Sequence, residues 1–151
     1  MFFGGFMSWT IALMILLEND KKIFHYMYFG YIFCLGALQI YVGLLVTTGF
    51  RDYTYLIFWH LPFLSWIGPF LILSFKTANA DSFHIRSVDY LHFVFGILMV
   101  LLMMPLALMD AETKMSFIMN KPDFTTGKIM FRYYSILSVA VGVSVFIYFL
   151  Y

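Results

Sequence analysis

Five long apolar runs, separated by short charged segments, constrain the fold of this chain more than any other feature. They cover, to a first approximation, residues 2–17, 23–47, 53–75, 88–109 and 129–151. About 20 apolar residues in a helix cross the hydrocarbon core of a bilayer, where the helix satisfies its own backbone hydrogen bonds. We therefore expect an all-α integral membrane bundle of about five transmembrane helices, with residues 1–151 forming a single domain.

The composition argues against a soluble domain. Of the 151 residues, 63% are hydrophobic and 11% are charged, against roughly 25% charged residues in soluble proteins. A soluble domain of this size cannot bury so much apolar surface, so the lipid bilayer is the expected environment. The net charge of +1 offers no basic surface for phosphate backbones, so nucleic acid is not an expected partner of this chain itself.

The connecting segments favour no strong orientation. Four of their basic residues fall on each expected side of the membrane, so positive charge is balanced. The compact Lys21–Lys22 pair favours an N-terminus outside. The last run reaches Tyr151 without a flanking Lys or Arg, which membrane helices commonly carry, and this raises the hypothesis that the chain is a fragment of a longer protein.

The third run contains two prolines seven residues apart, which would place both kinks on one face of a helix. Such breaks free backbone carbonyls, and a kinked helix can line a cavity or act as a hinge. The alternative interpretation is that proline is simply tolerated in membrane helices. The candidates for ligand contact or hinge motion are His60, Pro62, Trp66, Gly68, Pro69 and His92.

Two histidines, His60 and His92, fall within expected spans, where an imidazole needs a partner or a cavity. In antiparallel third and fourth helices they lie near opposite surfaces and share no ligand. His25 and His92 match better in depth and could supply two axial nitrogens to a haem. No glycine and arginine pattern for the propionates accompanies them, so hydrogen-bonded histidines are the preferred interpretation and no cofactor is expected.

The sequence predicts no catalytic residue and no metal site, and therefore no enzyme. No cluster of His, Cys, Asp and Glu has ligand spacing, and the buried hydroxyl groups have no base nearby. A methionine group could suggest a soft metal, but its first three members are adaptable packing residues in or at the end of a helix. That group is Met103, Met104, Met109, Met115 and Met119.

Small residues recur at four-residue spacing in the first and last runs. Gly4, Ser8 and Ala12 form one such face, and Ser138 with Gly142 forms another. Small residues let membrane helices approach closely. We expect these faces to pack within the bundle, in a homodimer, or against another membrane protein.

Several short motifs between residues 31 and 108 together resemble a known family. They are FCLG at 33–36, WHLPF at 59–63, IGPFL at 67–71 and DYLHF at 89–93. In this order they resemble the N-terminal membrane region of AraC-type regulators, in which several transmembrane helices precede a cytoplasmic helix-turn-helix DNA-binding domain. Phe70 replaces the leucine that usually follows Gly68-Pro69. The last two helices of the family and its DNA-binding domain have no counterpart in this chain.

The resemblance implies a multi-pass protein of a bacterial inner membrane with an outside N-terminus and a cytoplasmic 76–87 segment. It also implies a non-catalytic sensory module that passes a signal to a DNA-binding output. Two alternatives remain open at this point. One is a small accessory subunit of a membrane complex, and the other is a haem- or quinone-binding redox subunit.

Overall fold

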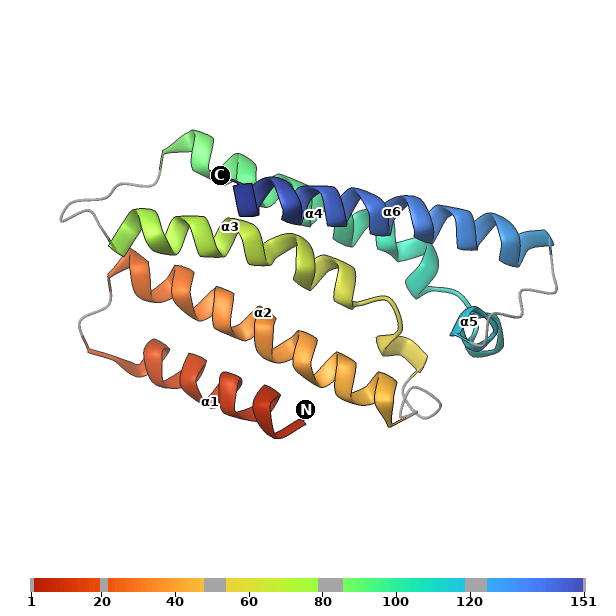
Figure 1. Ribbon diagram of the computed structural model, residues 1–151, viewed down its shortest axis with the longest axis horizontal. Helices are drawn as coiled ribbons and strands as arrows, with labels where there is room; N and C mark the ends of the chain where they lie inside the picture. The colour runs from red at the N-terminus through yellow and green to blue at the C-terminus, as the bar shows by residue number, and fades with distance from the viewer. Residues whose placement is uncertain (1, 20–21, 48–53, 79–85, 119–124, 151) are drawn as a thin grey trace.

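The computed structural model (Figure 1) describes residues 2–19, 22–47, 54–78, 86–118 and 125–150. All regular structure in this part of the chain is helical, so the expected all-α bundle is confirmed. The elements are α1 (Phe2–Leu17), α2 (Ile23–Val46), the short 3-10 helix η2 (Thr54–Leu56), α3 (His60–Ala78), α4 (Ser87–Ala107), α5 (Ala111–Ile118) and α6 (Thr125–Leu150).

Among the described residues, four helices are long and apolar enough to cross a membrane. Their candidate spans are Ile23–Val46, His60–Ala78, Asp89–Ala107 and Lys128–Leu150. α1 is also apolar but has 16 residues, which is about 24 Å of helix against a hydrocarbon core of about 30 Å. The bundle thus consists of four long apolar helices and a shorter one.

α3 is the central helix of the bundle. It packs against α2 on one side and against α4 and α6 on the other, while α1 packs against α2. Figure 1 shows α1, α2 and α3 side by side in chain order, with α4 and α6 beyond α3. The short α5 lies at one end, where it contacts η2 and α6. A movement of α3 would therefore affect its packing against α2, α4 and α6.

The main buried cluster joins the start of α3 to α4 and α6. Its members are Ile57, Phe58, Leu61, Met99, Met103, Leu106, Leu137 and Val141. Large apolar side chains also cover the outside of the helices, as Phe3, Leu101 and Phe146 illustrate. A lipid solvent explains this surface, because a water-soluble monomer rarely exposes extended apolar patches.

The start of the third helix differs from the prediction of one continuous span over residues 53–75. Regular α-helix begins at His60, after η2 and a turn in which Phe58 has a φ of 77°. Pro62 therefore lies in the first helical turn, where its missing N–H has no intrahelical partner to lose. The prediction of a kink at Pro62 was wrong, and Pro69 is the proline inside α3.

Side chains satisfy backbone groups at several helix ends. The backbone N–H of Lys22 donates to His25 Nδ1 over 3.0 Å, and that of Arg86 donates to Asp89 Oδ2 over 2.9 Å. Each acceptor lies three residues downstream, as in a capping box. At the other end of α4, Lys114 Nζ donates to the carbonyl of Ala107 over 2.7 Å.

The buried position of Lys114 changes the pKa of its side chain. Burial lowers the pKa of its ammonium group below the ordinary value, and the nearby Asp110 carboxylate opposes this shift. A cation at this place also interacts favourably with the C-terminal end of the α4 dipole. Lys114 thus fixes α5 to the end of α4.

Candidate functional site

A histidine–tyrosine pair joins the start of α3 to α6. His60 Nε2 lies 3.2 Å from the hydroxyl of Tyr134, within hydrogen-bond distance. The ring of Tyr41 from α2 packs against the same imidazole with ring centroids 4.5 Å apart. Three helices therefore meet at one imidazole.

The turn before His60 is held in an unfavourable backbone conformation. Phe58 is the non-glycine residue with positive φ in the described part of the chain. Such a conformation costs about 1–3 kcal/mol and persists only where the surroundings enforce it. Here the buried Phe58 ring packs against Tyr134, with centroids 4.9 Å apart, and this packing holds the turn.

His60 itself carries a second unfavourable feature. Its Nδ1 atom is buried and has no hydrogen-bond partner. An unsatisfied buried polar atom costs about 1–3 kcal/mol. Two costs thus occur within three residues, at the point where α3 begins and meets α6.

A cavity of about 470 Å³ adjoins this pair and lies between α2, the start of α3 and α6. Aromatic or imidazole rings belong to half of the ten lining residues that the structure describes: Tyr41, Phe58, His60, Phe131 and Tyr134. A neighbouring cavity of about 290 Å³ shares His60, Leu64 and Tyr134 and continues along α6. The first volume is within the usual range for small-molecule sites.

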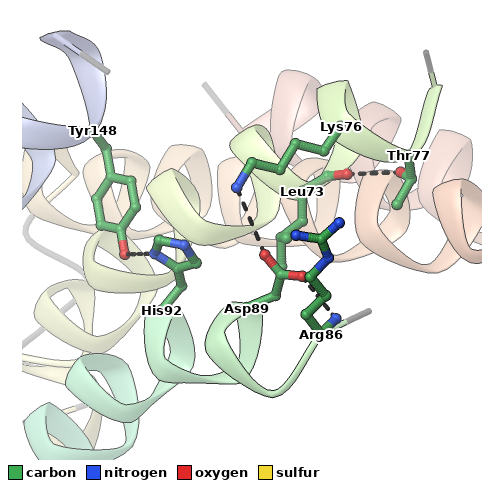
Figure 2. Close-up of polar contacts among 7 residues, drawn as sticks. All are labelled: Leu73, Lys76, Thr77, Arg86, Asp89, His92 and Tyr148. Atoms are coloured by element: carbon green, nitrogen blue, oxygen red, sulfur yellow. Dashed lines mark hydrogen bonds and ion pairs between the residues drawn. The ribbon is translucent and has the colours of Figure 1, made fainter. Parts of the chain in front are cut away.

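A second histidine–tyrosine pair lies at the other end of α6 (Figure 2). His92 Nδ1 from α4 is 2.9 Å from the hydroxyl of Tyr148. The Tyr148 ring also packs directly over Gly68 of α3. A Cβ on Gly68 would be 2.5 Å from this ring. Gly68 is therefore a packing position for α6 in this structure. Tyr148 connects α6 to both α3 and α4.

Charged residues join the end of α3 to the start of α4 one turn from His92 (Figure 2). Lys76 Nζ is 3.6 Å from Asp89 Oδ1, and the other carboxylate oxygen of Asp89 accepts the Arg86 backbone N–H. Asp89 is 6% exposed. Nearby, the Thr77 hydroxyl donates to the Leu73 carbonyl within α3. This corner fixes the geometry of the α3–α4 connection.

A second cavity of about 550 Å³ lies between α4 and α6 beside His92 and Tyr148. Its remaining walls are Phe95 and four smaller side chains of α6, among them Val143 and Ser144. This cavity thus has a histidine–tyrosine pair as the first cavity does, but fewer aromatic walls.

The six sequence candidates do not form one site. His60 and Pro62 lie at the start of α3, Trp66, Gly68 and Pro69 lie in its middle, and His92 lies at the far end of the bundle. The indole of Trp66 lies over Gly96 of α4, and its Nε1 is buried without a hydrogen-bond partner. Each histidine is instead matched with a different tyrosine of α6.

The small-residue faces have different surroundings. In α1, Ala12 is fully buried, Ser8 is half-buried, and a Cβ on Gly4 would meet the Gln39 side chain. α1 lies close to α2 at Gly5 and Gly36, where a Cβ on either residue would be 3.0 Å from the carbonyl oxygen of the other. This pair of glycines was not among the predicted positions.

In α6, the face of Ser138 and Gly142 borders the 290 Å³ cavity. The Ser138 hydroxyl donates to the carbonyl of Tyr134 in its own helix. A Cβ added to the exposed Gly142 would have no atom within 4 Å. This face thus lacks close helix packing in the described part of the chain.

The structure separates His25 and His92. His25 caps α2 and its Nε2 lies 3.2 Å from Glu18, while His92 contacts Tyr148. α3 lies between α2 and α4 (Figure 1). The haem hypothesis needed both imidazoles at one iron, and this arrangement does not bring them together. The described residues hold no group of three or more His, Cys, Asp or Glu side chains that could bind a metal.

The methionine group is dispersed as well. Met103 is in the core, whereas Met104 is largely exposed on α4, and Met109 and Met115 pack at the edge of the core. Met119 lies outside the described residues. The described methionines therefore lie in different parts of the bundle.

No family model, no curated protein and no solved structure matches the chain. The resemblance to AraC-type regulators stays a prediction. Function is therefore inferred from the geometry of the two histidine–tyrosine pairs and their cavities.

Proposed function

We propose that the chain is a non-catalytic signal-input module of a membrane, in which the start of α3 has two arrangements that α6 reports. The observation that carries this proposal is the pair of unfavourable features in one turn, the left-handed Phe58 and the unpartnered His60 Nδ1. Both costs favour a second arrangement in which they are relieved. A ligand shifts such an equilibrium by binding one arrangement more tightly.

The contacts of His60 and Tyr134 support a route for the signal. Their hydrogen bond links the start of α3 to α6, and α6 contacts α5 at the same end of the bundle. A change at the cavity would thus alter α6 relative to α3 and reach α5. In a longer protein of the AraC type, a DNA-binding domain would receive this signal, and the bilayer or a second copy would be the partners of this chain.

The test is a distance measurement across the cavity. Spin labels are attached at two exposed positions, Val46 of α2 and Ile136 of α6, in a Cys34→Ala background. Tyr134→Phe, which removes the hydrogen bond to His60, is expected to change the distribution of label distances measured by electron paramagnetic resonance. Tyr133→Phe is the matched control, because Tyr133 donates to the Leu102 carbonyl of α4 instead.

Transcript sequencing in producing cells tests the input role itself. Tyr134→Phe, but not Tyr133→Phe, is expected to change a defined set of transcripts. Label distances that are the same in wild type and Tyr134→Phe would contradict the two-arrangement proposal. Changed distances with unchanged transcripts would contradict the role in transcription.

One observation favours a second candidate function, that of an accessory subunit. The exposed Gly142 on α6 has open space around it, and small residues at lipid-facing positions favour the docking of another membrane helix. Co-purification with other proteins at fixed stoichiometry, lost on Gly142→Leu, would support this function.

A further inference from the structure

The cavity beside His60 has a hydrogen-bonding requirement that follows from counting hydrogens. A neutral imidazole carries one N–H and a neutral phenol carries one O–H. His60 and Tyr134 make one hydrogen bond with each other, which uses one of these two hydrogens. One donor hydrogen is left over in either tautomer.

The leftover hydrogen depends on the direction of the shared bond. If Tyr134 donates to Nε2, the imidazole N–H is on Nδ1, which has no partner. If Nε2 donates to Tyr134, the phenol hydrogen is left and Nδ1 is an acceptor without a partner. In both cases one donor hydrogen has no partner, so a ligand that completes the pair must carry a hydrogen-bond acceptor.

The walls of the cavity restrict the rest of the ligand. Tyr41 comes from α2, Phe131 comes from α6, and Phe58 lies in the turn before α3. Aromatic walls favour stacked or edge-on contacts with another flat ring. None of the lining residues that the structure describes carries a charged side chain, so a charged ligand would lose its hydration without a counter-charge from them.

We propose that this cavity binds a flat, uncharged aromatic molecule with a hydrogen-bond acceptor oxygen, such as an aromatic ketone, with the oxygen at the His60–Tyr134 pair. That this molecule acts as the signal rests on the proposed signal-input function. Binding itself is measured without any signalling output, so the two can fail separately.

The experiment compares 9-fluorenone with fluorene, in which a CH₂ group replaces the carbonyl. The purified full chain in lipid nanodiscs is dialysed to equilibrium against empty nanodiscs, so partition into lipid cancels. We expect about tenfold tighter retention of fluorenone, the value of one hydrogen bond, and a lower carbonyl stretching frequency of the bound ketone. Equal retention of the two compounds would overturn the proposal.

Two matched tryptophan substitutions locate the site. Val42 lines this cavity and Val143 lines the cavity between α4 and α6, and both are exposed. Val42→Trp is expected to abolish retention of both compounds, whereas Val143→Trp leaves it unchanged. The reverse pattern, or retention in Val42→Trp, would overturn the assignment to this cavity.

The count of donor hydrogens predicts different results for the single and double variants of the His60–Tyr134 pair. His60→Phe leaves the phenol donor and Tyr134→Phe leaves the imidazole donor, so each single variant is expected to keep a preference for fluorenone. The double variant His60→Phe with Tyr134→Phe has neither donor and is expected to retain the two compounds equally. A surviving preference in a helical, monodisperse double variant would contradict the proposal.

The ligand class and the signal-input role can also be tested separately. Fluorenone retention with the expected pattern, but without a change in the Val46–Ile136 label distances, would support the ligand class and contradict the proposed function. A change in the label distances on Tyr134→Phe, together with equal retention of fluorenone and fluorene, would support the proposed function and contradict the ligand class.

Discussion

Single glycines determine where the large side chains of α3 and α6 can lie. Gly96 accepts the Trp66 indole on its surface, and Gly68 accepts the Tyr148 ring. The first contact joins the consecutive helices α3 and α4, and the second joins α3 to α6, which is distant in sequence. In a bilayer, where helices gain little from the hydrophobic effect between them, such close contacts carry much of the packing energy.

We expect Gly96→Ala to destabilise the bundle by about 1–3 kcal/mol, because its methyl group would overlap the Trp66 indole and force repacking. Gly142→Ala is the matched control, since its methyl group would meet no atom within 4 Å. Removing a helical glycine there is expected to be neutral or to stabilise by up to about 1 kcal/mol. Loss of helicity with added denaturing detergent measures both. Equal stability of the two variants would contradict the indole contact.

The sequence indicated the two histidines of the pairs but not their partners. His60 and His92 stand out because polar groups are rare in apolar runs. Tyr134 and Tyr148 do not stand out among 11 tyrosines, since tyrosine is common near membrane surfaces. Their spacing of 14 residues, about 21 Å of helix, matches the two ends of the bundle, but only the tertiary arrangement relates each tyrosine to one histidine.

At the level of the elements, hydropathy predicted the long helices well. The predicted run at 2–17 matches α1, and the runs at 23–47 and 88–109 differ from α2 and α4 by no more than two residues at an end. The third run failed at its start, because apolar residues such as Ile57 and Phe58 occupy a buried turn as readily as a helix. α5 has eight residues, too few to give a transmembrane signal.

The two roles of Asp89 can be separated at the start of α4. Lys76→Ala removes the ion pair and keeps the acceptor for the Arg86 N–H; the ion pair is partly exposed at Lys76 and is expected to contribute less than about 1 kcal/mol. Asp89→Ala removes the ion pair and the acceptor for the Arg86 N–H, so it is expected to cost about 1 kcal/mol more. Unfolding in denaturing detergent gives both values. A larger effect of Lys76→Ala would contradict the capping role.

At the level of the whole molecule, burial is uneven. The main core lies among α3, α4 and α6, and the outer faces of the helices present apolar side chains. The bilayer completes this structure, so its stability is a property of the protein with its lipid. Sequence composition predicted this class, because long runs with few charges suit helices that satisfy their own backbone hydrogen bonds in lipid.

The single cysteine offers a measure of global unfolding. Cys34 of α2 is 2% exposed, so a maleimide is expected to label it only when the bundle opens. Labelling should follow loss of helicity as denaturing detergent is added. Val46→Cys in a Cys34→Ala background is the accessible control, because Val46 is exposed and should react at once. Fast labelling of Cys34 in the folded protein would contradict the placement of α2.

The contact between Gly5 and Gly36 also has a consequence for the history of this protein. Because a Cβ on either glycine would be only 3.0 Å from the backbone carbonyl oxygen of the other, a larger residue at one position pushes α1 away from α2 whatever occupies the other. Descendants of a common ancestor that retain this α1–α2 hairpin should therefore keep both glycines or lose both together. The two positions would vary as a unit across a lineage, while Gly142, with open space around it, would drift independently.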